Sequence, residues 1–383
     1  MSRLIASTLL VVTLSLVGGT SPAQEHRAGA GAWNREAAAK YLDQRMDTWF
    51  EKGQKLQTGA GQTTCVSCHT VIPYALARPA LRRAMRASEP TPQEARLVDE
   101  TTRRVQASGP TDLLYEPDEA QSNGTEAVLY ALVLASADRA RGVAQPRDAT
   151  RRAFERMWHA QRDDGAWDWL DVGLEPFESI GSAYVGAAFA ALAAGFEPTP
   201  LTGPAAPGVA RLQAYLRTNY ASQNLHNRIW TLLASTSLPG LLSPADVEAL
   251  VSELQRRQGA DGGWSLSELG GWQWNKAAAP FQSPGQRDLQ LAARSDGYAT
   301  GLIVYTLRRA GVSAEHAAIT RGRQWLIAHQ LPIRIGEQEW LAWRAYSLNY
   351  DREQGGARGE PWRRLFMSDA ATAFATLGLL ATE

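Results

Sequence analysis

The feature that most constrains the fold is an alternation of two kinds of helical segment. Segments rich in Ala, Gly and Leu occur at Thr125–Ser136, Ile180–Ala194, Leu225–Ser235, Tyr298–Ala310 and Ala370–Leu380. The last four follow segments with one charged face, at Arg147–Gln161, Val209–Tyr220, Pro244–Gln258 and Ala314–Gln330. Small-residue apolar helices tolerate burial on most sides, whereas helices with one polar face belong at the surface. The alternation therefore predicts pairs of inner and outer helices.

Earlier segments extend the pattern to six helical hairpins. Apolar spacing predicts an outer helix over Trp33–Glu51, followed by an inner helix that Pro73 opens in its first turn. A polar helix from Thr91 to Ser108 precedes the apolar segment at Thr125. Helical hairpins repeating every 40 to 60 residues or so indicate an array or a closed ring, and no convincing alternating strand pattern appears. We expect a single all-α domain over residues 34–383.

The N-terminus is typical of a secretory signal peptide. Arg3 precedes an apolar run from Leu4 to Val17, and small residues follow up to Ala23. We expect cleavage after Ala23, which gives a signal peptide at residues 1–23 and a linker at 24–33, with an uncleaved anchor as the alternative. No later segment reaches transmembrane length without charges. The mature protein is therefore expected to be periplasmic or secreted, with no stable membrane span.

Charge excludes one class of partner. The chain has 39 basic and 39 acidic side chains, and no basic patch or tail stands out. Nucleic-acid binding depends on such a patch, so we do not expect a nucleic-acid partner.

Both cysteines of the chain lie in one short motif, Cys65-Val66-Ser67-Cys68-His69. This spacing is the attachment signature of c-type haem, in which two thiols bond the porphyrin and the histidine ligates iron. The alternatives are a reducible disulfide or a chance match, and a zinc site lacks further cysteines. The motif predicts one covalent haem c held by Cys65, Cys68 and His69.

The sixth iron ligand is harder to assign. Closure of a six-hairpin ring would bring the last inner helix beside the first, so that Met367 approaches His69. A methionine thioether is a usual axial ligand, which places Met367 first. An open or water-bound position and His226 are the alternatives.

The outer helices end in a recurring pattern of glutamine and tryptophan. The copies are Gln161 with Gly165-Ala166-Trp167, Gln258 with Gly262-Gly263-Trp264, and Trp325 with Gln330, where the Gly-x-Trp is absent. This pattern resembles the QW repeat of the squalene–hopene cyclase and terpenoid cyclase/protein prenyltransferase superfamily. The resemblance implies an α6/α6 toroid and, as partner, an apolar or prenyl small molecule. In the first hairpin the haem motif takes the place of Gly-x-Trp, at one mouth of the ring.

Three long loops are expected at that same mouth. They span residues 162–178, 261–295 and 332–368, and they carry eight of the 13 tryptophans. Long, non-repetitive loops at one end of a scaffold are where functional residues are usually found.

Cyclase chemistry has only weak candidates. The chain lacks the Asp-x-Asp-Asp run of class II terpenoid cyclases, and only Asp296 and Asp369 match its final acid. Each fits an N-cap better, because a helix dipole stabilises a carboxylate rather than a protonated acid. Glu126, on an apolar helix, is a third candidate.

These features favour an exported monohaem protein on a toroid scaffold, acting in electron transfer or haem-dependent redox chemistry with an unidentified redox partner protein. The alternatives are a squalene-cyclase-like cyclase or lyase that uses the central cavity, or a non-catalytic binding module.

Overall fold

The computed structural model describes residues 32–58, 61–107, 118–198, 205–272, 294–335, 337–349 and 360–383. The expected signal peptide and almost all of the expected linker lie outside these ranges. Within them, no helix is long and apolar enough to cross a membrane.

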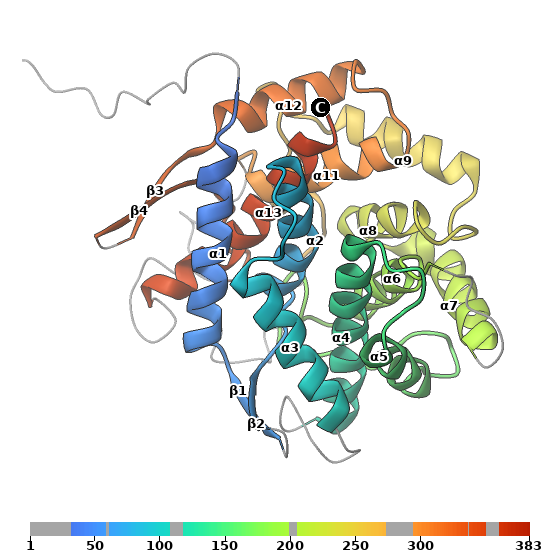
Figure 1. Ribbon diagram of the computed structural model, residues 1–383. Coiled ribbons are helices and arrows are strands. Elements are labelled where there is room, and N and C mark those ends of the chain that lie inside the picture. The colour runs from blue at the N-terminus through green and yellow to red at the C-terminus, as the bar shows by residue number, and fades with distance from the viewer. Residues whose placement is uncertain are drawn as a thin grey trace, which may run out of the picture.

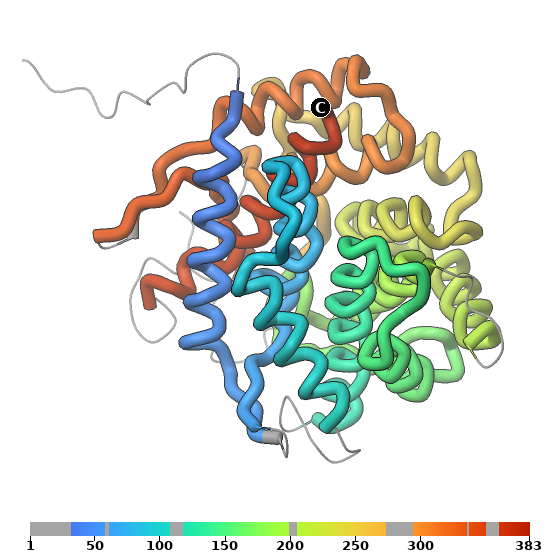
Figure 2. The backbone as a smooth tube through the Cα atoms, in the orientation of Figure 1, coloured from blue at the N-terminus to red at the C-terminus, as the bar shows by residue number. Residues whose placement is uncertain are grey.

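The described helices form two concentric layers (Figure 1). The outer helices are α1 (Arg35–Lys52), α3 (Pro92–Ala107), α5 (Asp148–His159), α7 (Ala206–Asn219), α9 (Pro244–Arg256) and α12 (Ala317–Ala328). The inner helices are α2 (Val71–Ala84), α4 (Glu119–Arg141), α6 (Ala183–Ala194), α8 (Leu225–Ser235), α11 (Gly297–Arg309) and α13 (Phe366–Leu380). Each inner helix contacts the next, and α13 contacts α2. The ring is therefore closed, and the predicted all-α toroid is confirmed (Figure 2).

Small residues allow the inner helices to approach one another closely. A Cβ built on Gly301 of α11 would lie 2.3 Å from the backbone nitrogen of Ala375 in α13. A Cβ on Gly124 of α4 would lie 2.1 Å from the carbonyl oxygen of Asp168. No larger side chain fits at either position, which explains why the inner segments are rich in Gly and Ala.

Two β-hairpins were not predicted. Strands β1 (Lys55–Thr58) and β2 (Gly61–Thr64) lie between α1 and the cysteine motif. Strands β3 (Leu331–Ile335) and β4 (Gln338–Ala342) follow α12. Such short two-stranded ribbons depend on packing against helices for their stability, and a sequence pattern does not show that packing.

The β3–β4 hairpin explains the incomplete third repeat. The indole of Trp343, just after β4, donates to the carbonyl of Leu326 at 2.7 Å. Trp167 and Trp264 make the equivalent bonds to Met157 and Leu254, at 2.7 and 2.8 Å. Trp343 therefore takes the missing tryptophan's position, with the hairpin inserted before it.

The three repeat glutamines join neighbouring outer helices. Gln161 donates to Gly208 at 3.0 Å, which links α5 to α7, and Gln258 donates to Ala318 at 2.9 Å, which links α9 to α12. Gln330 donates to the carbonyl of Asn34 at 2.8 Å and accepts from its amide at 2.7 Å. This last pair links the end of α12 to the start of α1 and closes the outer layer.

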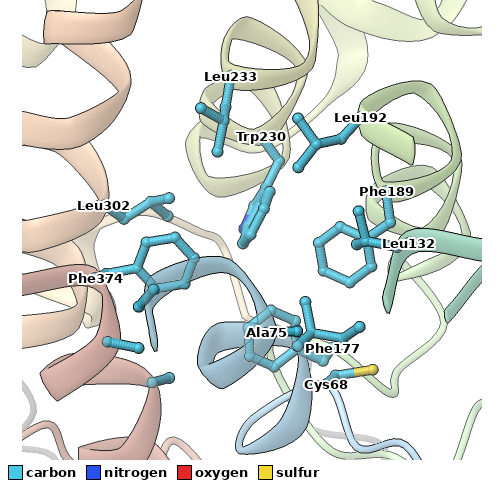
Figure 3. Close-up of a cluster of buried hydrophobic side chains, with 14 of the residues drawn as sticks. Cys68, Ala75, Leu132, Phe177, Phe189, Leu192, Trp230, Leu233, Leu302 and Phe374 are labelled. Atoms are coloured by element: carbon cyan, nitrogen blue, oxygen red, sulfur yellow. The ribbon is translucent and has the colours of Figure 1, made fainter. Parts of the chain in front are cut away.

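Aromatic side chains fill the axis of the ring. The rings of Phe189 and Trp230 lie 4.6 Å apart, and those of Trp230 and Phe374 lie 5.4 Å apart, between centroids (Figure 3). All three side chains are buried. This aromatic cluster separates the two ends of the toroid, so each end is considered separately below.

Replacing Gln330 tests the seam between the first and last hairpins. We expect Gln330→Ala to lower the free energy of unfolding by about 1–2 kcal/mol, because two partly buried hydrogen bonds are lost. Urea unfolding followed by tryptophan fluorescence measures the change. Gln213→Ala, which removes one exposed bond to Pro239, is the control with a smaller expected effect. Equal effects of the two variants would contradict a role for Gln330 in closure.

Candidate functional site

A pocket of about 200 Å³ lies at the mouth formed by the N-terminal ends of the inner helices. We call it the mouth pocket, and its lining is both charged and aromatic: His69, Leu174, Glu175, Phe177, Glu178, Ser347, Asn349, Arg363, Phe366 and Met367. These residues come from the turn before α2, the loop before α6, the segment after β4 and the start of α13. The toroid thus brings three distant loops together at one site.

Two aromatic contacts and one hydrogen bond fix the orientation of the His69 ring. Its ring stacks on Phe366 with centroids 4.1 Å apart, and Trp49 packs edge-on at 5.3 Å. Its Nδ1 lies 2.8 Å from the Thr70 hydroxyl, which in turn donates to Asp369 Oδ2 at 2.7 Å. Because that hydroxyl proton is directed to the carboxylate, Thr70 accepts from Nδ1–H.

Asp369 is the buried centre of this arrangement. Arg45 of α1 binds it through two nitrogens, at 2.7 and 3.0 Å, and Tyr41 donates to it at 2.9 Å. Burial raises the pKa of Asp369, and Arg45, Thr70 and Tyr41 oppose the rise. The structure therefore gives Asp369 a structural role in joining α1, α13 and the turn that carries His69.

Two carboxylates, Glu175 and Glu178, lie on one tight loop before α6. The backbones of Leu174 and Glu178 bond each other in both directions at 2.8 Å. Asn349 accepts from the amide of Glu175 and donates to its carbonyl, at 2.8 and 2.7 Å. Ser179 donates to Glu175 Oε2 at 2.7 Å, a bond that favours the ionised carboxylate. The loop is thus fixed to the segment after β4, and both carboxylates line the mouth pocket.

The two cysteines of the haem motif do not line this pocket, although its histidine does. Cys65 and Cys68 form no disulfide within the described residues, and they are 4% and 2% exposed. Cys68 lies beside Phe177 and Ala75 in the aromatic cluster (Figure 3), and burial raises the pKa of its thiol. Met367 and His69 line one pocket, as ring closure predicted, but neither cysteine lines it. As arranged, these residues do not fit a haem that both thiols and His69 would share.

The other predicted site residues are buried away from the mouth pocket. His226 Nε2 lies 2.8 Å from the Tyr298 hydroxyl. Asp296 caps α11 through the amide of Ala299 at 2.9 Å, and burial raises its pKa to about 7. Glu126 accepts from two arginines, Arg104 and Arg156, each at 2.9 Å. The structure gives all three a packing or capping role.

Comparison with solved structures supports the toroid. The chain matches a structure of unsaturated glucuronyl hydrolase from Bacillus sp. GL1, described as responsible for the degradation of glycosaminoglycan. It also matches a UGL variant named with the saccharide dGlcA-Glc-Rha-Glc. Both matches have 10% identity and a TM-score of 0.50, and they cover 88% of this chain and 94–95% of the other. No protein-family model and no curated protein sequence matches.

The function expected from the sequence is corrected by these findings. The matched toroids are glucuronyl hydrolases, not terpenoid cyclases or cytochromes. In the described part of the chain, no group of three or more His, Cys, Asp or Glu side chains could hold a metal ion. The expected haem-dependent redox chemistry and electron transfer are therefore corrected, because the matched toroids are named for glucuronyl hydrolysis and the described residues contain no such metal-binding group.

Sequence reasoning missed the two carboxylates, Arg363 and Asn349. The loops that carry them were noted for their tryptophans, and the signal in Glu175-Pro176-Phe177-Glu178 was overlooked. A pair of acids three residues apart in a mouth loop is visible in the sequence. Its proximity to His69 depends on closure of the ring.

Removing the charge of Asp369 tests the buried junction. We expect Asp369→Asn to destabilise the protein by ~3–5 kcal/mol, because Arg45 is left buried without its counter-charge. Tyr41→Phe removes a single bond to the same carboxylate and should cost about 1 kcal/mol. Urea unfolding of both variants measures the difference. A loss no larger for Asp369→Asn than for Tyr41→Phe would contradict the junction's importance.

His226 gives the fold a defined acid sensitivity. Burial lowers its pKa to about 3, whereas the unfolded side chain titrates near pH 6.5. As the pH falls, the unfolded state therefore takes up a proton on His226 before the folded state does. The contribution of the neutral, buried His226 to the free energy of unfolding is present above about pH 6.5 and is lost as the pH falls. We expect stability to fall by about 3 kcal/mol more in the wild type than in His226→Gln between about pH 7 and about pH 4. The free energy of unfolding in urea is measured for both proteins across this pH range, and an equal decrease in the two would contradict the prediction.

Proposed function

We propose that the protein is a hydrolase that cleaves a glycosidic bond of a small anionic saccharide in the mouth pocket. One observation carries the proposal: a single pocket is lined by two acidic residues, Glu175 and Glu178, together with His69 and Arg363. The pocket is at the end of the toroid where the long loops meet.

The carboxylate pair supports hydrolysis. Glycosidic bonds are usually cleaved by two carboxyl groups, one that protonates the leaving oxygen and one that activates water or stabilises the sugar cation. Ser179 favours the ionised form of Glu175, which suits the second role. Glu178 is then the candidate acid. The imidazole of His69 is oriented by Thr70 and suits a proton-transfer group or a hydrogen-bond partner of a sugar hydroxyl.

The remaining lining supports an anionic sugar. Arg363 is 40% exposed and pairs with Glu360 at 3.3 Å, a partly exposed contact that a substrate carboxylate could replace. An arginine fork matches a carboxylate in two parallel bonds. Phe177 and Phe366 provide apolar faces for a sugar ring. One of the matched toroids is named as a glucuronyl hydrolase, and the other is named with a saccharide that contains dGlcA. Both names refer to an anionic sugar.

Export is part of the proposal. The segment from Arg3 to Ala23 predicts secretion, which would place the enzyme outside the cytoplasm with polysaccharide fragments. The whole chain should therefore be produced with its leader and recovered from the periplasm or the medium.

Turnover of an unsaturated glucuronyl disaccharide tests the function. The loss of ultraviolet absorbance from the conjugated sugar acid reports cleavage, and released sugar confirms it. We expect Glu178→Gln and Glu175→Gln to lower kcat by about 100-fold or more, because a proton donor or a charge at the reacting centre is lost. Arg363→Ala should raise KM by about tenfold with a smaller change in kcat.

Matched substitutions on α5 provide the controls. Glu155→Gln and Arg152→Ala remove the same groups from exposed positions that do not line the mouth pocket, and they should leave activity unchanged. Circular dichroism verifies that each variant is folded. Absence of turnover by the folded wild type on glucuronyl saccharides, or full activity of both glutamine variants, would overturn the proposal.

A further inference from the structure

The opposite end of the toroid has a second and larger pocket. It measures about 420 Å³, and we call it the basal bowl. All six inner helices contribute to it near their C-terminal ends. The aromatic cluster lies between the two pockets, with Leu192 and Leu233 of the bowl at one end and Phe177 of the mouth pocket at the other (Figure 3). The bowl is therefore a site distinct from the proposed active site.

The floor of the bowl is apolar. Leucines from four inner helices line it: Leu76, Leu192, Leu233, Leu377 and Leu380. Phe196, just after α6, adds an aromatic face. The volume lies in the range of small-molecule sites, roughly 300–1,000 Å³. The floor thus suits a hydrocarbon group.

The rim of the bowl is positively charged. Arg83, Arg139, Arg308 and Arg309 line it, and no carboxylate does so among the described residues. None of the four forms an ion pair within the described part of the chain, although many other arginines of this protein do. Four guanidinium groups around one cavity repel each other and attract an anion.

Two of the four rim arginines bond carbonyl groups near helix ends, and within the described residues the other two do not. Arg308 donates to the carbonyl of Ala381 at 2.9 Å, and Arg83 donates to that of Ala140 at 3.4 Å, as basic residues near helix C-termini commonly do. Arg139 instead lies over the Phe196 ring, 4.6 Å from its centroid. Partial desolvation of the otherwise exposed side chain, with repulsion from Arg309 and Arg83, lowers the pKa of Arg139. The Arg139–Arg309 pair is thus electrostatically unfavourable without a counter-ion.

Two hydroxyl groups add hydrogen-bonding capacity. Ser237 lines the bowl, and its buried hydroxyl has no hydrogen-bond partner in the described residues. Tyr305 lines it as well, and burial raises the pKa of its phenol, so that the group is a neutral donor. A buried polar group without a partner is destabilising unless a ligand or water satisfies it.

We infer that the basal bowl binds an amphiphilic anion, with a phosphate or carboxylate head at the arginine rim and an apolar tail on the leucine floor. The rim alone would suit a free anion, and the floor alone would suit a neutral apolar molecule. Their combination in one cavity selects a molecule that has both parts. This site is independent of the proposed hydrolase function.

Calorimetric titration of the whole exported protein tests the inference. The probes are dodecyl phosphate and dodecanoate, each below its micelle concentration, with inorganic phosphate and decanol as the head and tail alone. We expect one site for at least one of the two amphiphiles, and its affinity should exceed that of phosphate or decanol by about tenfold or more. Comparing the two amphiphiles identifies the head group.

Variants locate the binding. Arg139→Ala/Arg309→Ala should weaken amphiphile binding by about tenfold or more, because two charge-assisted contacts are lost. Leu380→Glu, at a half-buried floor position, should weaken it similarly by repelling the head and wetting the floor. Arg152→Ala/Arg256→Ala removes two exposed arginines elsewhere and should change nothing. No binding of either amphiphile, phosphate binding as tight as dodecyl phosphate, or equal affinity in all variants would overturn the inference. Hydrolase activity, measured separately, should survive the Arg139/Arg309 variant.

Discussion

The ion pair between Arg45 and Asp369 is the contact on which the rest of this structure depends. It joins the first outer helix to the last inner helix, and Asp369 also accepts from Thr70, next to His69. A buried carboxylate is stable only where partners satisfy its charge, so Asp369 requires α1, α13 and the turn before α2 to lie together. The same contact therefore closes the ring and fixes the imidazole of the mouth pocket.

In this toroid the packed inner helices form the scaffold, and the polar groups of both pockets lie at its two ends. The inner helices pack through small residues, and aromatic rings fill the axis between them. Polar groups collect at the two ends, where the N-termini of the inner helices meet the long loops and their C-termini carry arginines. Loops can change without disturbing the packed ring, and this explains how one fold can carry unrelated sites.

The haem motif shows why a short pattern needs its surroundings. Cys65, Cys68 and His69 have the spacing that haem attachment requires, but attachment also requires that both thiols and the imidazole face one cavity. Here the backbone between them directs Cys68 into the aromatic cluster and His69 into the mouth pocket. Spacing fixes the separation of side chains along the chain, whereas their directions depend on how the turn packs against α1 and α13.

The sequence alone determined the layers of this protein. Alternation of small-residue and charged segments depends on local periodicity, and it placed each outer helix within about three residues. The inner helices were placed less closely, because α4 extends several residues beyond both ends of the expected Thr125–Ser136. The tertiary structure alone decided which loops share a pocket. Glu175, Asn349 and His69 are far apart in the chain, and only closure of the ring brings them together, because that closure depends on long-range contacts such as Arg45–Asp369 that leave no periodic signal in the sequence.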